Sequence, residues 1–312
     1  MKPLRLQPVY KDIIWANHRL SDIRHLSSQS MGIAREVCAY KGSENTVASG
    51  PYKGEKISQV IAEHHDELMG EDPNTQLLRA AYMDSKEDLS IQVHPNAEQA
   101  AEIGDYEKTE SWYILEAEPG AKITAGVSID DKAVLREAAE NGTLEQYLIT
   151  HPVKPGDFVL IPANLVHANG AGMLVIEFGS FGGITYRLYD YGRPRPLDLD
   201  HSFQIMNTKL RTEVTHHPLP TEPTSQLQNG VDCDKFSVDI LDVKDTAEIG
   251  PYDDYYVIVC VAESCFLKCD EDEYPLSYTE SILIPSHSSR IEVKGNCRLL
   301  LGHYKAKGNQ PE

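Results

Sequence analysis

The chain is short of basic residues. It carries 29 Lys and Arg against 48 Asp and Glu in 312 residues, so its formal net charge at neutral pH is −19. A charge of this size works against binding to duplex nucleic acid, because the phosphates repel it. It does not exclude a small anionic substrate, because screening over about 8–10 Å lets a local basic pocket dominate. We therefore expect no nucleic-acid partner and keep small anionic molecules as candidates.

Long apolar runs and cysteine are also scarce. The longest apolar stretches, such as Tyr255–Ala262, fall far short of the roughly 18–20 residues that cross a bilayer. The first 15 residues contain no apolar core of signal-peptide length. Six cysteines in so long a chain are typical of reduced thiols rather than of a disulfide framework. These observations predict a cytoplasmic protein with no membrane partner.

What the chain contains is a series of short apolar runs separated by Gly, Pro, Asn and Asp. Such runs between turn signals favour an all-β sandwich or barrel. Examples are Leu89–His94, Ser111–Leu115, Lys122–Ala125, Phe158–Ile161, Leu174–Phe178, Thr185–Tyr189, Tyr255–Val261 and Ser281–Ile284.

Helical periodicity is limited to two stretches, Ile57–Met69 and Asp130–Ile149. The second lies between two β-rich blocks, so we interpret residues 129–150 as a helical insert in a β domain. Residues 207–234 are rich in Thr, Pro, His and Gln and contain an Asn-Gly turn signal. We interpret them as a linker to a second β block, residues 235–312.

Two predicted strands carry polar side chains that share a face. Alternate residues of a strand point the same way, so Ser90, Gln92 and His94 are expected on one side of their strand. The same rule places Lys108 and Glu110 together. Glu110 is of a type that ligates divalent metals, and Lys108 is of a type that binds phosphate or assists proton transfer. Each pattern also occurs on ordinary solvated strands, and a surface Lys–Glu pair contributes only about 0–1 kcal/mol.

A third pattern is more specific. Gly156, Pro162 and His167 have the spacing of the second conserved motif of cupin barrels, and Asn164 stands at the position of its second Gly. Asn is the residue that best replaces Gly where φ is positive.

Together these patterns predict one metal site made of His94, Glu110 and His167, with Gln92 as a possible fourth ligand. Two imidazoles and one carboxylate suit a zinc ion that keeps a coordination position open. The same ligands in another geometry bind ferrous iron, so the residues leave the metal undetermined.

Two further side chains could take part in chemistry. Glu177 ends an apolar strand, where burial would raise the pKa of its carboxyl group toward a useful range. Either Lys108 or Glu177 could therefore relay a proton, although Glu177 is equally a candidate for a structural role. Arg193 and Arg195 alternate with prolines that keep the chain extended, and guanidinium groups suit phosphate oxygens. A solvated loop is the alternative for both arginines.

Five stretches in order resemble type I mannose-6-phosphate isomerases, particularly the short bacterial form. They are TVASGPYKG at 46–54, KEDLSIQVHPN at 86–96, KTESWYI at 108–114, PGDFVLIPANLVHA at 155–168 and TYRLYDYGRPR at 185–195. The likeness covers most of residues 1–205 and, more loosely, the C-terminal block.

The resemblance implies a zinc enzyme, with one Zn²⁺ per chain, that interconverts mannose 6-phosphate and fructose 6-phosphate through an enediol. By position, Gln92, His94, Glu110 and His167 match the family's metal ligands, and Arg187 matches its catalytic Arg. Ser90 and Lys108 match positions of the substrate site, and Arg193 joins them as a phosphate candidate.

The implied fold is mainly β, with two cupin (jelly-roll) barrels and a small helical insert. Residues 1–128 and 151–206 would form the catalytic barrel, and residues 235–312 a second, metal-free one.

The sequence also departs from the family pattern. Ala81 stands where the family has Lys, and Gly183 where it has Asp. These departures leave two alternatives open. One is a non-catalytic metal-binding cupin that binds a sugar or sugar phosphate as a sensor or accessory module. The other is a divergent isomerase of another sugar.

Overall fold

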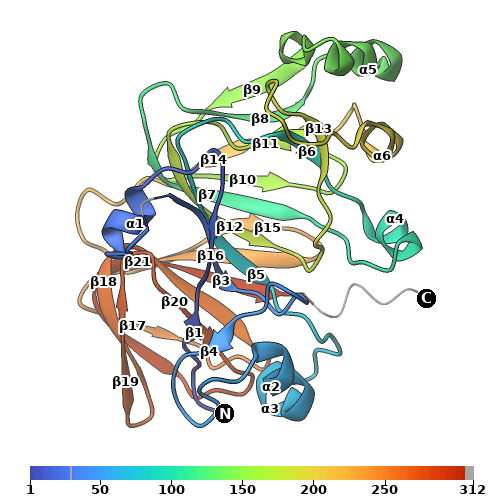
Figure 1. The fold of residues 1–312 in the computed structure, drawn as a ribbon. Coiled ribbons are helices and arrows are strands. Elements are labelled where there is room, and N and C mark those ends of the chain that lie inside the picture. Colours follow the sequence, from blue (N-terminus) through green and yellow to red (C-terminus); the bar gives the residue numbers. More distant parts are fainter. Residues whose placement is uncertain (29, 306–312) are drawn as a thin grey trace. The chain divides into compact units, whose positions relative to one another are not determined.

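Strands make up most of the regular structure, as the sequence predicts (Figure 1). The computed structural model describes residues 1–28 and 30–305. The chain divides into two compact units. The first comprises residues 1–9, 34–81 and the chain from 217 onward, and the second comprises residues 10–33 and 82–216. No helix of the described residues is both long and apolar enough to span a membrane.

The second unit is built on two sheets. One has the strand order β14-β10-β7-β12-β5-β3-β2, and the other the order β13-β6-β11-β8-β9. The first sheet consists of β14 (Val214–His216), β10 (Asp157–Ile161), β7 (Glu110–Ala117), β12 (Met173–Gly179), β5 (Arg79–Ser85), β3 (Met31–Val37) and β2 (Val9–Asp12). The second consists of β13 (Tyr186–Tyr189), β6 (Ile91–Val93), β11 (His167–Ala168), β8 (Lys122–Val127) and β9 (Leu148–Pro152). The boundaries between the units fall at or within β2, β3 and β5.

A hydrophobic core joins the facing sides of these two sheets. Trp112 and Ile114 of β7 and Val159 of β10 pack in one cluster with Ile123 and Ala125 of β8. The alternate residues of each strand supply this core, as expected for two sheets packed face to face. The polar positions of the same inner faces are therefore shielded from water.

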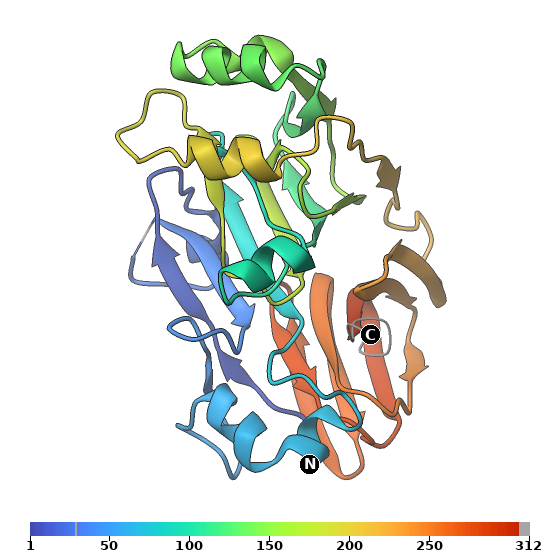
Figure 2. The same cartoon turned by 90° about the vertical axis from the view of Figure 1, so that its right-hand side faces the viewer.

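Helices cover the other side of the second sheet. Ile91 and Val93 of β6 pack in a cluster that includes Leu135 of α5 (Lys132–Glu140) and Phe203 of α6 (Leu199–Ile205). Figures 1 and 2 show α5 and α6 lying side by side. The predicted helix at 130–149 is therefore present as α5 followed by a short 3₁₀ helix, η1 (Leu144–Tyr147), with a turn at Asn141 and Gly142.

Asp131 caps the start of α5. Its side-chain oxygen accepts hydrogen bonds from the backbone N–H groups of Ala133 and Val134, at 3.0 and 3.2 Å. A capping carboxylate satisfies donors that the helix itself leaves unpaired. Two further short helices, α1 (Arg19–Ile23) and α4 (Ala97–Glu102), complete the second unit.

The first unit is built on one large antiparallel sheet. Its main order is β15-β16-β21-β18-β19, with β17 paired to β21 and β20 paired to β18. The strands are β15 (Gln226–Asp232), β16 (Phe236–Val243), β17 (Thr246–Ile249), β18 (Tyr256–Cys269), β19 (Asp272–Ser277), β20 (Ser281–Ile284) and β21 (Ile291–Tyr304). A small ribbon, β1 (Leu6–Gln7) with β4 (Thr46–Val47), and the helices α2 (Ile57–Glu63) and α3 (His65–Met69) belong to the same unit.

The observed units and elements differ in places from the predicted boundaries. Residues 34–81 belong to the same compact unit as the C-terminal strands. The helix expected at 57–69 is broken at His64, whose backbone leaves the helical region (φ −132°, ψ 38°). The segment interpreted as a linker contains all of β14 and all of β15. The part of the predicted second barrel beyond residue 305 lies outside the described residues.

Candidate metal centre

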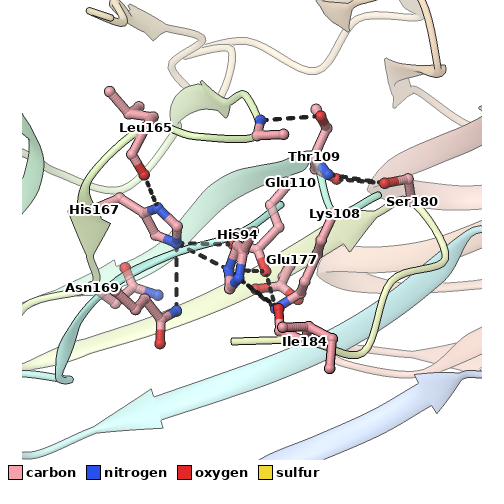
Figure 3. A network of polar contacts seen from close by, with 12 residues as sticks. His94, Lys108, Thr109, Glu110, Leu165, His167, Asn169, Glu177, Ser180 and Ile184 are labelled. Carbon is pink, nitrogen blue, oxygen red and sulfur yellow. Dashed lines mark hydrogen bonds and ion pairs between the residues drawn. The ribbon is translucent and has the colours of Figure 1, made fainter. Parts of the chain in front are cut away.

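Three buried side chains of the second unit converge on one point (Figure 3). His94 directly follows β6, Glu110 opens β7 and His167 opens β11. One ligand atom from each of the three lies within 4.8 Å of the others, and each residue is at most 1% exposed. The structure thus brings together the three residues that the sequence analysis selected as metal ligands.

Backbone carbonyl groups fix how both imidazoles are protonated. His94 Nδ1 lies 2.9 Å from the carbonyl oxygen of Ile184, and His167 Nδ1 lies 2.7 Å from that of Leu165. Because a carbonyl oxygen only accepts, each Nδ1 must carry the hydrogen, and in the neutral ring each Nε2 then presents a lone pair. The two Nε2 atoms are 3.1 Å apart. Two lone pairs at this distance repel each other unless a cation binds both.

The carboxylate of Glu110 faces the same point. Its Oε1 lies 3.3 Å from His94 Nε2 and its Oε2 lies 3.6 Å from His167 Nε2. Within the described part of the chain, neither oxygen accepts a well-directed hydrogen bond. The Lys108 ammonium is the nearby positive charge, with Nζ 2.5 Å from Oε1 and 3.2 Å from His94 Nε2. The lone pairs and the carboxylate of this centre therefore face a position that suits a positive charge.

The electrostatics keep all three residues in the metal-binding form. Burial lowers the pKa of His94, and it lowers the pKa of His167 to about 3, so both rings are neutral. Burial alone would favour the protonated form of Glu110. The Lys108 ammonium outweighs it and holds the pKa of this carboxyl group well below its usual value. Two neutral imidazoles and a carboxylate fit Zn²⁺ or Fe²⁺.

Gln92 lies beside this triad. It pairs in register with His167 across β6 and β11, and its Nε2 is 3.4 Å from His167 Nε2. The oxygen and nitrogen of a side-chain amide are exchanged by a half turn. With that turn the amide oxygen would face the centre, so the placement of Gln92 is compatible with a fourth ligand.

Two other predicted site residues are buried in the same unit. Ser90 is buried and comes immediately before β6. Glu177 is buried on β12, and its Oε2 accepts a hydrogen bond from Trp112 Nε1 at 3.3 Å. The Trp112 ring in turn packs edge-on against the His167 ring, with centroids 5.6 Å apart. Figure 3 shows the Glu177 side chain next to the His94–Glu110 pair.

Arg187 lies on β13, opposite Gln92 of β6. Residues opposite each other across a sheet share a face, so Arg187 is on the face that carries the metal centre. One guanidinium N–H donates to the carbonyl oxygen of Pro196 at 2.8 Å. The Nε is buried and has no hydrogen-bond partner among the described residues. Burial lowers the pKa of this guanidinium.

Arg193 is engaged by the protein itself. Its Nε donates to Asp190 Oδ1 at 3.1 Å, and its terminal nitrogen donates to the carbonyl oxygen of Asp88 at 2.7 Å. Asp190 had no assigned role in the sequence analysis. The available signal was a lone acidic residue shortly before two arginines, in the segment 187–195.

The structure shows the surroundings of Ala81 and Gly183, the two residues that depart from the family pattern. Ala81 is buried within β5, where a long cationic side chain would need a partner. Gly183 donates its backbone N–H to a carboxylate oxygen of Asp105 at 3.2 Å.

Comparisons with known proteins agree with this fold. The family model described as "Mannose-6-phosphate isomerase, cupin domain" matches residues 227–304. The mannose-6-phosphate isomerase ManA of Bacillus subtilis is 30% identical over 97% of this chain and 99% of its own length. A mannose-6-phosphate isomerase of Streptococcus mutans is 27% identical over 97% and 98%.

The chain is also similar to solved structures of mannose-6-phosphate isomerases. The crystal structure of the Bacillus subtilis mannose 6-phosphate isomerase superposes with a TM-score of 0.87 at 29% identity, covering 97% of this chain and 100% of that one. A putative mannosephosphate isomerase from Archaeoglobus fulgidus shares the fold, with a TM-score of 0.82 at 18% identity over 98% of both chains. The chain therefore belongs to the mannose-6-phosphate isomerase family.

Proposed function

We propose that this chain is a zinc-dependent aldose–ketose isomerase that interconverts mannose 6-phosphate and fructose 6-phosphate through an enediol. The observation that carries the proposal is the pair of Nε2 lone pairs of His94 and His167, which face each other beside the ionised carboxylate of Glu110. The relatives named as mannose-6-phosphate isomerases supply the substrate class.

His94, Glu110 and His167 would hold the ion, with Gln92 as a fourth ligand. Zn²⁺ is the proposed ion, and another divalent metal would fit the same donors. When bound, such an ion supplies Lewis acidity toward the sugar oxygens near C1 and C2.

We assign Arg187 to the negative charge that develops in the reaction. Moving a proton between C1 and C2 places that charge on a sugar oxygen, and a fixed donor stabilises it more than water does. The unpaired, buried Nε of Arg187 is such a donor. Loss of one preorganised donor typically costs about 2.7–4 kcal/mol of barrier.

Lys108 and Glu177 are the two candidates for proton transfer. In the structure the Lys108 ammonium is paired with Glu110, so in this state it can donate a proton but not accept one. Glu177 has the chemistry of a base, since an ionised carboxylate only accepts. We therefore favour Glu177 for taking the proton from one of the carbons C1 and C2 and returning it to the other. Lys108 would give a proton to the carbonyl oxygen and take one back from the neighbouring hydroxyl group.

For the phosphate group on C6 we propose Ser90, because Lys108 and Arg187 are assigned above to the reaction at C1 and C2. Arg193 is a further candidate. Because Asp190 and Asp88 already accept its hydrogen bonds, a phosphate would have to share its donors with them.

A coupled assay of fructose 6-phosphate formation from mannose 6-phosphate tests the proposal. We expect turnover in the purified protein, its loss on chelation and its recovery when Zn²⁺ is added back. Metal binding and measurable sugar-phosphate affinity with no turnover, across several sugar phosphates, would instead indicate a non-catalytic metal-binding cupin. Turnover of another sugar phosphate alone would indicate a divergent isomerase.

A further inference from the structure

The segment 190–198 folds back onto Arg187 and forms hydrogen bonds with both its backbone and its side chain. At the backbone, Arg187 N–H donates to Asp198 Oδ2 at 3.0 Å, and Asp198 N–H donates to the carbonyl oxygen of Arg187 at 2.7 Å. At the side chain, the carbonyl oxygen of Pro196 accepts from the guanidinium at 2.8 Å. The direction of the guanidinium therefore depends on where Pro196 lies.

An ion pair with a buried carboxylate fixes Arg195, the residue next to Pro196. Asp190 is only 2% exposed, and its two carboxylate oxygens each lie 2.6 Å from a different guanidinium nitrogen of Arg195. This two-point geometry restricts both distance and orientation, unlike a single contact between charges. Because Arg195 is directly bonded to Pro196, the pair also fixes the carbonyl group that holds Arg187.

Asp190 has a second partner that anchors it in turn. Arg193 donates to Asp190 Oδ1 and also to the carbonyl oxygen of Asp88, in the segment that precedes β6. The carboxylate is thereby tied to the strand that carries Gln92. It also offsets the mutual repulsion of the three arginines at 187, 193 and 195, which a charge-free side chain would not do.

From these contacts we propose that Asp190 is the positioning residue for Arg187. Through Arg195 and Pro196 it keeps the guanidinium directed along the face of the sheet that bears His94, Glu110 and His167. The catalytic part of this inference rests on the proposed function, because it takes Arg187 as the group that stabilises the developing charge. The structural part does not, because it concerns only the orientation of Arg187.

The variant Asp190→Asn tests the catalytic part, because it removes the charge and keeps the shape. We expect kcat to fall at least tenfold, with KM changed less than threefold and the zinc content unchanged. In an Arg187→Ala background the same change should cost nothing further, because the two residues act through one group. The matched control is Asp200→Asn, which breaks an exposed Asp–Arg pair with Arg136 in the same unit and should leave kcat unchanged.

The Nε–H resonance of Arg187 in ¹⁵N-labelled protein tests the structural part without any substrate. The signal is assigned by its disappearance in Arg187→Lys. We expect it to be sharp and slowly exchanging in the wild type and in Asp200→Asn, and broadened or fast-exchanging in Asp190→Asn. Should Asp190→Asn not fold, Arg195→Lys serves instead, since it keeps the charge but loses the two-point pair.

The results of these two experiments test the catalytic part and the structural part of the inference separately. An unaltered Arg187 signal in Asp190→Asn, or an equal loss of rate with and without Arg187, would overturn the inference. A wild type without isomerase activity would count against the proposed function, while the resonance would still decide whether Asp190 orients Arg187.

Discussion

At the scale of single residues, the centre is defined by which ring nitrogens carry hydrogen. The carbonyl groups of Ile184 and Leu165 take the Nδ1–H of His94 and His167, so that both Nε2 atoms turn inward. Hydrogen bonds of this kind are typical of imidazoles that bind metals. The backbone thus prepares the site before any ion binds.

Removing one imidazole should empty the site. We expect about one zinc ion per chain in the wild type and a loss of at least tenfold in metal affinity in His167→Ala, measured by metal analysis after dialysis. His18→Ala is the control, because the His18 side chain is exposed and pairs with Asp22, one helical turn away. Full zinc retention in His167→Ala would contradict the assignment of this ligand.

Arg187 should matter for rate and not for metal. In Arg187→Ala we expect kcat/KM to fall about 10²–10³-fold, the range for loss of one fixed donor to a developing oxyanion. The zinc content should stay at the wild-type level. The control is Arg136→Ala, a change at a solvent-exposed ion pair of the same unit. If metal is lost with Arg187, or if the rate persists, the role given to it is wrong.

Much of the centre could be predicted from local patterns, and the remainder could not. The period-two alternation of strands indicates that Gln92 and His94 share a face, and the cupin spacing selects His167. Alternation also places Lys108 beside Glu110, but no local pattern contains the contact of Lys108 with His94, because it depends on the register of two different sheets. The role of Asp190 depends on a loop that returns to β13, which a spacing argument does not reach.

At the scale of elements, the close approach of neighbouring segments leaves no room for a side chain at some positions. Gly170 lies between β11 and β12, and a Cβ atom built there would lie 2.0 Å from the carbonyl oxygen of Lys122 at the start of β8. Backbone cannot move aside as a flexible side chain can. A side chain at this position would have to push two strands apart.

We therefore expect Gly170→Ala to lower the free energy of unfolding by about 2 kcal/mol or more, measured by urea denaturation. Gly179→Ala is the matched control, because a Cβ at that position meets only ordinary contacts of 3.5 Å or longer. It should be tolerated within about 0.5 kcal/mol. Equal stabilities of the two variants would show that the approach of β8 to Gly170 is not a packing constraint.

Element boundaries show where sequence patterns are weakest. The strands at 111–115 and 158–161 were expected within a residue or two of their observed ends, because each combines alternation with flanking turn signals. The helix at 57–69 keeps its apolar face but breaks at His64, which periodicity alone does not signal. The grouping of residues 34–81 with the C-terminal strands is a matter of tertiary packing, and no composition change marks it.

At the scale of the whole molecule, one buried carboxyl group should make the free energy of unfolding depend on pH. Asp84 of β5 is fully buried, and its Oδ2 accepts the backbone N–H of Leu20 at 2.9 Å. Burial raises its pKa to about 6 from an ordinary value of 3.8, although Leu20 and Arg19 oppose this shift. The folded state therefore binds the proton more tightly than the unfolded state does.

The sign of the pH dependence follows from that difference. The contribution of protonated Asp84 to stability is complete below about pH 4 and is lost as the pH rises through 6. Relative to Asp84→Asn, the wild type should lose up to about 3 kcal/mol of unfolding free energy between pH 4 and pH 7. Urea denaturation of both proteins across this range measures the difference. Asp22→Asn, which removes an exposed carboxyl group, is the control for the exchange of Asp for Asn itself. A constant difference between wild type and Asp84→Asn would mean that Asp84 stays ionised in the core, held by Arg19 and the Leu20 N–H more strongly than burial disfavours its charge.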